Sequence, residues 1–197
     1  MASKAERTTQ FIIETVAPVF NKHGYIGTSM SDIVAATGLT KGAIYGNFKN
    51  KEDLALAAFN HNLKQVMGAI ARKIEAATTP LEKIKALIDF YRSYHEFTIP
   101  FGGCPILNVG IDANHQNPPL MERVMEVIQK LQASIVLIVE AGIKNKDFRA
   151  DADAKGFARK LFSITEGAIF MTMTMNNSRY LLDATDVLEQ MLISDLL

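Results

Sequence analysis

The sequence predicts an all-α protein, and three observations support this fold class. Apolar residues recur at three- and four-residue intervals along most of the 197-residue chain, as on the buried face of a helix. Glycine, proline and small polar residues divide these stretches at positions typical of helix starts and ends. Nowhere do two alternating stretches indicate a convincing pair of strands. Roughly nine helices are expected, far above the usual helical share of about one third.

The N-terminal helix is expected from about Lys4 to His23, because Ile12, Val16 and Phe20 recur at helical spacing. Pro18 lies inside this helix. Since proline removes a backbone hydrogen bond and clashes with the preceding turn, we expect a kink or local loosening there.

Two very short helices and a glycine turn are predicted next. Hydroxyls of Thr28 and Ser29 can cap the first helix, which should end at Gly38, and Thr40 can cap the second. The apolar residues that these helices can share as a small core are Ile33, Leu39, Ile44 and Phe48. This pattern predicts a helix-turn-helix, with a purely structural pair of helices as the alternative.

The residues left outside that core suit duplex DNA. Gly42 and Ala43 are small enough to let a helix approach the base edges in the major groove. Lys41 can reach guanine acceptors or a phosphate, and Tyr45 can contact a base edge or a thymine methyl. Thr40 and Asn47 can bond phosphate oxygens. A second phosphate clamp is expected at Lys51, where the next helix begins. The predicted DNA contacts are Thr28, Ser29, Thr40, Lys41, Gly42, Ala43, Tyr45, Asn47 and Lys51.

This segment resembles the DNA-binding domain of the TetR-type (TetR/AcrR) bacterial transcription regulators. The matching residues are His23-Gly24-Tyr25, Thr28-Ser29, Gly38-Leu39-Thr40-Lys41-Gly42, Tyr45, Phe48 and Lys51, in order and without gaps. The chain departs from the family pattern at two positions. Asn47 stands where the family usually has histidine, and Gly46 occupies a position that is often larger.

Composition and charge limit the possible functions. A net charge of zero argues against a general coat for nucleic acid, yet no acid lies between Lys41 and Lys51. A small basic edge on a neutral protein predicts that two copies bind one DNA. No apolar stretch is long enough to span a bilayer and no signal peptide is indicated, so the chain is expected to be cytoplasmic and without a membrane partner.

The remainder of the chain predicts further helices. The expected elements are a long helix from Lys51 to about Ala76, a helix beginning at Thr79-Pro80 and reaching Phe97, a loop over 98–103, a short helix over Pro105 to Ala113 that could also be a strand, a long helix from Asn117-Pro118-Pro119 to Lys144 or Asn145, a turn over 148–153, and two final helices capped by Asp153 and Asp183.

The resemblance implies how these helices are used. It implies a helix-turn-helix DNA-binding domain over residues 1–54, followed by a larger helical domain over 55–197 for effector binding and dimerisation. The last two helices would pair with those of a second copy. Their broad apolar faces independently require a partner surface. A twofold dimer would place two recognition helices about one DNA turn apart, roughly 34 Å, on a palindromic operator.

An effector cavity is predicted around the aromatic residues of the middle helices, although ordinary core packing is the alternative. Aromatic faces beside a glycine-rich loop can form a largely apolar pocket with polar tips. The predicted ligand-binding residues are Phe90, Tyr91, Tyr94, Phe97, Phe101, Cys104, Asn108 and Glu166. Cys104 is also open to readings as a small buried hydrophobe or as a redox or electrophile sensor.

Other chemistry is not indicated. Cys104 is the single cysteine, which excludes an internal disulfide, and no evident partner base makes it a catalytic nucleophile. The four histidines do not have the spacing of a metal site, and no cofactor is expected. The helix-turn-helix pattern predicts a DNA-binding regulator, and the family resemblance implies a repressor that a small, largely apolar effector releases from its operator. A DNA-binding architectural or protein-recruiting regulator without a ligand is the alternative.

Overall fold

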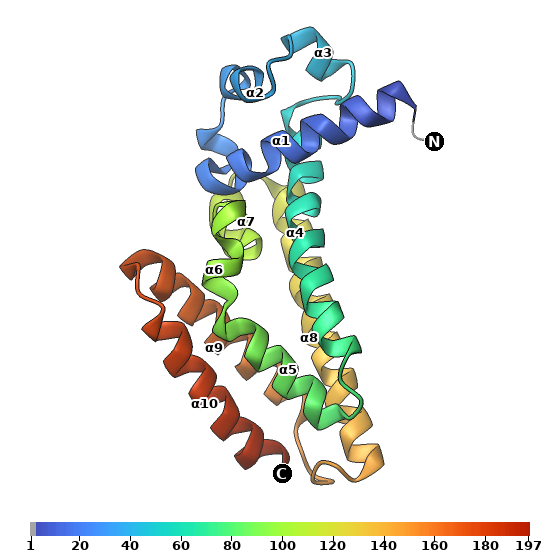
Figure 1. Cartoon of the computed structure of the whole chain (residues 1–197), viewed down its shortest axis with the longest axis vertical. Helices are drawn as coiled ribbons and strands as arrows, with labels where there is room; N and C mark the ends of the chain where they lie inside the picture. The colour runs from blue at the N-terminus through green and yellow to red at the C-terminus, as the bar shows by residue number, and fades with distance from the viewer. Residues whose placement is uncertain (1–2) are drawn as a thin grey trace. The chain divides into compact units, whose positions relative to one another are not determined.

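The computed structural model describes residues 3–197, which form ten α-helices and one 3₁₀ helix with no strand within that range (Figure 1). The elements are α1 (Lys4–Gly27), α2 (Met30–Thr37), α3 (Lys41–Tyr45), α4 (Lys51–Glu75), α5 (Pro80–Arg92), α6 (Tyr94–Thr98), η1 (Ile99–Phe101), α7 (Pro105–Ala113), α8 (Pro118–Asn145), α9 (Ala154–Met175) and α10 (Arg179–Leu196). The predicted all-α class is confirmed.

The helices form two compact units. The first unit comprises the chain up to Val66 together with Thr98–Val124, and the second comprises Met67–Phe97 with Met125–Leu197. Both α4 and α8 therefore contribute to both units. The unit that contains the helix-turn-helix also contains η1 and α7, which follow it by some 50 residues in the sequence.

In the first unit, α1 packs against α2, η1 and α7. Its start is fixed by a capping box, in which Ser3 accepts from the Glu6 amide and Glu6 accepts from the Ser3 amide. Its backbone leaves helical angles at Gly24, with φ 76° and ψ 168°, a region that is essentially restricted to glycine. The predicted first helix is thus present, and its interruption is found at Gly24, one residue beyond its expected end.

The two short helices form as predicted because their ends are locally encoded. Ser29 and Asp32 make a capping box at the start of α2, and Gly38 ends α2 in the left-handed conformation with φ 68°. Thr40 caps α3 by accepting from the Ala43 amide. Ile33, Ile44 and Phe48 are buried as expected, and Leu39 is half-buried at the turn.

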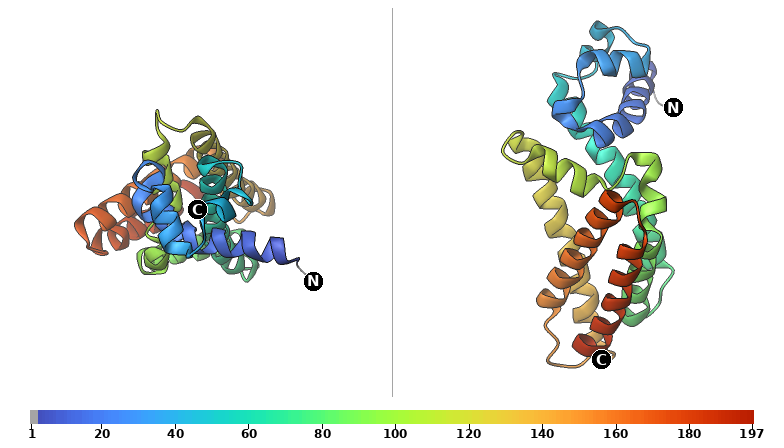
Figure 2. Two further views of the ribbon diagram at one scale, coloured as in Figure 1. Left: turned by 90° about the horizontal axis from the view of Figure 1, so that it is seen from above. Right: turned by 90° about the vertical axis from the view of Figure 1, so that its left-hand side faces the viewer.

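In the second unit, α10 packs along α9 and against α5 (Figure 2). Phe157 and Leu161 of α9 are buried, as is Leu188 of α10, so the two helices share an apolar seam. At the surface, Arg92 at the end of α5 pairs with two carboxylates of α10, Asp186 at 3.1 Å and Glu189 at 2.7 Å.

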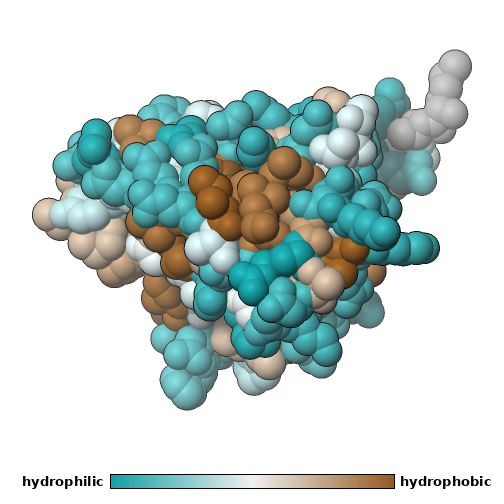
Figure 3. Space-filling model, turned by 90° about the horizontal axis from the view of Figure 1, so that it is seen from below, coloured by the Kyte–Doolittle hydropathy of each residue, from teal (hydrophilic) through white to brown (hydrophobic). Residues whose placement is uncertain are grey.

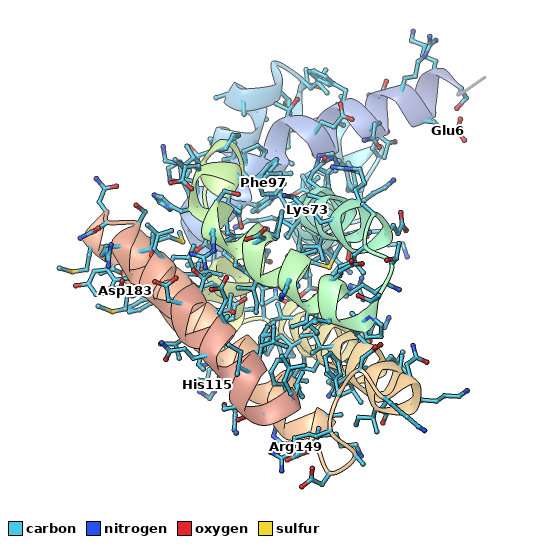
Figure 4. All side chains as sticks on the ribbon, turned by 60° about the horizontal axis from the view of Figure 1, so that its bottom comes forward. Glu6, Lys73, Phe97, His115, Arg149 and Asp183 are labelled. Atoms are coloured by element: carbon cyan, nitrogen blue, oxygen red, sulfur yellow. The ribbon has the colours of Figure 1, made fainter. Side chains whose placement is uncertain are left out.

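Three expectations for the chain beyond α4 are wrong. The first is the loop expected over 98–103, which instead contains the end of α6 and the 3₁₀ helix η1. The last helix begins at Arg179, not at Asp183, so Asp183 lies within α10 (Figure 4) and pairs with Arg179 one turn earlier at 2.7 Å. The helix expected from Pro80 to Phe97 is divided, because α5 ends at Arg92 and α6 starts at Tyr94. The segment Pro105 to Ala113 is a helix, as favoured over a strand.

Candidate nucleic-acid interface

The exposed face of α3 carries the residues predicted to contact bases. Lys41 and Gly42 are exposed, and Tyr45 is 41 % exposed although it follows the buried Ile44. The Lys41 ammonium lies 5.8 Å from the centre of the Tyr45 ring, so a cation and an aromatic hydroxyl are presented together. This helix can enter a major groove with both side chains directed at base edges or phosphates.

The start of α2 lies in the same helix-turn-helix. Ser29 is exposed and its hydroxyl donates to Asp32 at 2.7 Å, and hydrogen bonds from Ser29 lower the pKa of the Asp32 carboxyl. Thr28 is different, because it is only 1 % exposed and its hydroxyl donates to the carbonyl oxygen of Gly24 at 2.7 Å. The Thr28 side chain therefore faces the protein interior and supports the turn between α1 and α2.

The Asn47 side chain joins α3 to α1. Its Nδ2 donates to the carbonyl oxygen of Ala43 at 2.8 Å, and its Oδ1 accepts from the Thr9 hydroxyl at 2.7 Å. An amide nitrogen carries two hydrogens, so one remains for a phosphate oxygen.

Lys51 lies at the first turn of α4. Its ammonium donates to the carbonyl oxygen of Tyr25 and stands 4.3 Å from the centre of the Tyr25 ring. Burial lowers the pKa of Lys51, while the carboxylates of Asp112 and Asp32 act in the opposite direction. The start of α4 is capped by Asn50, whose Oδ1 accepts from the Asp53 amide at 2.8 Å.

The second unit contains an apolar cavity of about 380 Å³. Its lining comes from α4, α5, α8 and α9, and consists of Met67, Ile70, Ala71, Ile74, Glu75, Leu87, Tyr91, Leu131, Ser134, Ile135, Leu137, Ile138 and Phe162. The polar groups among these are the hydroxyls of Tyr91 and Ser134 and the carboxylate of Glu75. A concave, largely apolar site with a few polar groups has the character of a small-molecule pocket.

The predicted ligand-binding residues are distributed over both units. Tyr91 lines this cavity and contacts an aromatic cluster with Phe90 and Tyr94, whose ring centroids lie 5.4 to 5.8 Å apart. Phe97 joins the cluster through Phe90, and Glu166 is half-buried on α9.

Phe101, Cys104 and Asn108 belong instead to the first unit. Cys104 is fully buried at the start of α7. Asn108 directs its amide nitrogen at the backbone carbonyls of Asn21 and Gly102, at 2.9 and 3.0 Å. Met67, Ile70 and Ile74 of the cavity lining recur at helical spacing in the sequence, but periodicity alone does not distinguish a cavity wall from a filled core.

Over residues 3–197, no three histidine, cysteine or acidic side chains gather closely enough to hold a metal ion. Within the same range, no helix combines the length and the apolar character needed to cross a membrane.

Comparison with known proteins places this architecture in a family. The family model described as bacterial regulatory proteins of the tetR family matches residues 12–58, and the tetracyclin repressor-like C-terminal domain matches residues 80–188. The HTH-type transcriptional regulator LmrA of Bacillus subtilis (strain 168) is 25 % identical over 182 residues, covering 92 % of this chain and 94 % of LmrA.

Two solved structures agree over nearly the whole chain. A TetR-family transcriptional regulator from Cytophaga hutchinsonii is 37 % identical with a TM-score of 0.92, covering 100 % of this chain and 98 % of the other. A TetR transcriptional regulator from Chloroflexus aurantiacus J-10-FL is 36 % identical with a TM-score of 0.93, covering 98 % of each chain. The chain therefore belongs to the TetR family and is a DNA-binding transcriptional regulator, not an enzyme.

Proposed function

We propose that the protein is a repressor that a small, largely apolar effector releases from a palindromic operator. The observation that carries this proposal is the 380 Å³ cavity in a unit that does not contain the helix-turn-helix. A pocket separate from the DNA-binding residues allows a ligand to act on DNA binding only through a change of conformation. The match to a repressor-like C-terminal domain supports the sign of regulation.

The cavity lining also indicates the class of effector. Glu75 is its charged member, and no lysine, arginine or histidine occurs among the described lining residues. An anionic ligand would approach the Glu75 carboxylate without a cation to compensate the two negative charges. Moving that ligand from water into the cavity would therefore be unfavourable. The effector is accordingly uncharged or cationic, with an apolar body. The Ser134 hydroxyl donates its own hydrogen to the Lys130 carbonyl at 2.9 Å, so its oxygen can accept from a donor on the effector.

DNA contacts are proposed for exposed and half-buried residues of the helix-turn-helix and for Lys51. Residues 1–54 hold these contacts, while residues 55–197 bind the effector and form the dimer. The proposed contact residues are Ser29, Thr40, Lys41, Gly42, Ala43, Tyr45, Asn47 and Lys51.

Dimerisation is proposed through α9 and α10. Large apolar side chains are exposed on both helices, including Phe170 at 45 %, Met175 at 55 % and Val187 at 49 %. Most of the surface in the view of Figure 3 is hydrophilic, so large exposed apolar side chains are unusual on the face it shows. Exposed apolar area of this kind is stabilised by a partner, and a twofold arrangement with a second copy would cover both helices at once.

The proposal can be tested by filling the cavity. Duplexes bound by the protein are selected from genomic DNA, and candidate uncharged and cationic compounds are screened for release of the best duplex. Ala71→Phe places a ring at the cavity wall, whereas Ala133→Phe adds the same ring to an exposed position of α8 outside the described lining. We expect the first variant to bind the duplex and to lose its response to compound, and the second to respond normally.

Two results would contradict the proposal. Equal responses of both variants would mean that the effector binds elsewhere. If no compound of either class released the duplex, a regulator that acts without a ligand would be favoured.

A further inference from the structure

The C-terminal part of α1 is fastened to η1 and α7 by a reciprocal pair of asparagines. Asn21 Nδ2 donates to the carbonyl oxygens of Phe101 at 2.6 Å and Gly103 at 2.8 Å. Asn108 Nδ2 returns the contact by donating to the carbonyl oxygen of Asn21 at 2.9 Å. Asn21 is only 3 % exposed, so this contact lies in the interior of the first unit.

One turn further along α7, Asp112 reaches the interruption of α1. The Tyr25 amide donates to Asp112 Oδ2 at 2.6 Å. A Cβ at Gly24 would lie 2.5 Å from Asp112 Oδ1, so the carboxylate occupies the space that glycine leaves open. The bond is charge-assisted and satisfies an amide next to the break in the helix.

Tyr25 in turn holds Lys51. Its carbonyl accepts from the Lys51 ammonium and its ring stands beneath that ammonium, so the same residue fixes the lysine by two contacts. Asp112 binds the amide of Tyr25, and Lys51 binds its carbonyl. Lys51 and a residue of α7 that lies 61 positions later in the chain are thus linked through Tyr25.

We propose that Asp112 is a positioning residue for DNA binding, which holds Tyr25 so that Lys51 is presented to a phosphate. The proposal rests on the proposed phosphate contact of Lys51. Asp112 lies within residues 80–188, which match the C-terminal domain of the family. A residue from the segment that matches the C-terminal domain thus helps to position Lys51 beside the helix-turn-helix.

A double-mutant cycle tests this proposal. The full chain is titrated by fluorescence anisotropy against one duplex selected from random-sequence DNA, over a range of salt concentrations. The proteins are the wild type, Asp112→Ala, Lys51→Ala and the double variant. Glu122→Ala is the matched control, because Glu122 is an exposed carboxylate of the same unit. Thermal unfolding shows that each variant is folded at the assay temperature.

We expect Asp112→Ala to weaken binding by about tenfold, as for the loss of a hydrogen bond to a charged group. Its slope of log affinity against log salt should flatten by about 0.9, the share of one phosphate contact. In the Lys51→Ala background, Asp112→Ala should then have little further effect, and Glu122→Ala should bind as the wild type. A merely structural role of Asp112 would leave the slope unchanged and make the two losses multiply.

The outcomes separate this inference from the function on which it rests. If Lys51→Ala leaves affinity and salt slope unchanged, both the phosphate contact and the role of Asp112 are refuted. If Lys51→Ala weakens binding but the two losses multiply, only the role of Asp112 is refuted. Should Asp112→Ala not fold, Asp112→Leu keeps a similar side-chain volume while removing both acceptors for the Tyr25 amide, and the same loss and non-additivity with Lys51→Ala are required.

Discussion

The Thr9 hydroxyl donates to Asn47 Oδ1 across 2.7 Å, which connects α1 to the turn that ends α3. The other polar group of Asn47 holds the Ala43 carbonyl, so this side chain fixes α3 on one side and α1 on the other. The orientation of α3 is therefore set partly by Thr9, which lies 38 positions before Asn47 in the chain.

Removing this bond should weaken operator binding. We expect Thr9→Val to lower affinity by about 2- to 10-fold, the range of one hydrogen bond, because α3 loses part of its support. The matched control is Thr8→Val, since the Thr8 hydroxyl donates to the Lys4 carbonyl within α1 itself. Anisotropy titrations with one duplex measure the difference. Equal affinities of the two variants would show that α3 does not need this support.

Base selection and overall affinity should be separable. Tyr45→Ala removes an exposed ring that we place against base edges, so discrimination between sequences should fall by about 1 to 3 kcal/mol. Lys51→Ala removes a phosphate contact, so binding should weaken alike for all sequences, with a flatter salt dependence. Competition between selected and scrambled duplexes distinguishes these effects. If Tyr45→Ala weakened binding to all sequences alike and Lys51→Ala reduced discrimination, α3 would not be the helix that contacts the base edges.

The oligomeric state should depend on the exposed face of α10. Val187→Glu places a carboxylate where we expect a second copy to pack, so a particle with twice the 21.7 kDa of one chain should become a monomer. Ile99→Glu introduces the same charge at a position that is 61 % exposed and lies on η1. Light scattering after size exclusion measures both masses. A dimeric Val187→Glu variant would place the interface elsewhere.

Stability at acidic pH should depend on the cap of α5. Hydrogen bonds from Thr78 and Thr79 lower the pKa of Glu82 from 4.5 to about 2. Because the folded-state pKa is depressed, this contribution is fully present above pH 4.5 and is lost as the pH falls toward 2. Glu82→Gln should therefore unfold at a lower temperature than the wild type at pH 7, with the difference shrinking below pH 4.5. A difference that is constant with pH would contradict the assignment.

The helix-turn-helix could be predicted from the sequence because its signals are local. Ser29, Gly38, Thr40 and Asn50 act within three or four residues of their positions, where backbone geometry leaves few alternatives. Asp183 shows the limit of such signals. An aspartate ahead of an apolar periodic stretch resembles a cap, but within a helix it can equally pair with an arginine four residues earlier.

The residues predicted to bind a ligand lie in two different environments. Tyr91 was expected in a pocket and lines the cavity, while Asn108 was expected there and instead holds Asn21, 87 residues away. The choice between these environments depends on which helices meet, and helical periodicity carries no information about that. The same holds for Asp112, since nothing near it in the sequence indicates the Tyr25 amide.

The discontinuity of the first unit limits how far this regulator is modular. A fragment ending near residue 58, where the N-terminal family match stops, would lack Asn108 and Asp112 and would leave the last turn of α1 without its partners. During synthesis, the first unit, which contains the helix-turn-helix, cannot be completed until residue 124 has been made. A hybrid regulator that joins this helix-turn-helix to the C-terminal domain of another protein should also keep Thr98–Val124 of this chain. The corresponding segment of the other protein would pack against α1 with side chains that do not match it.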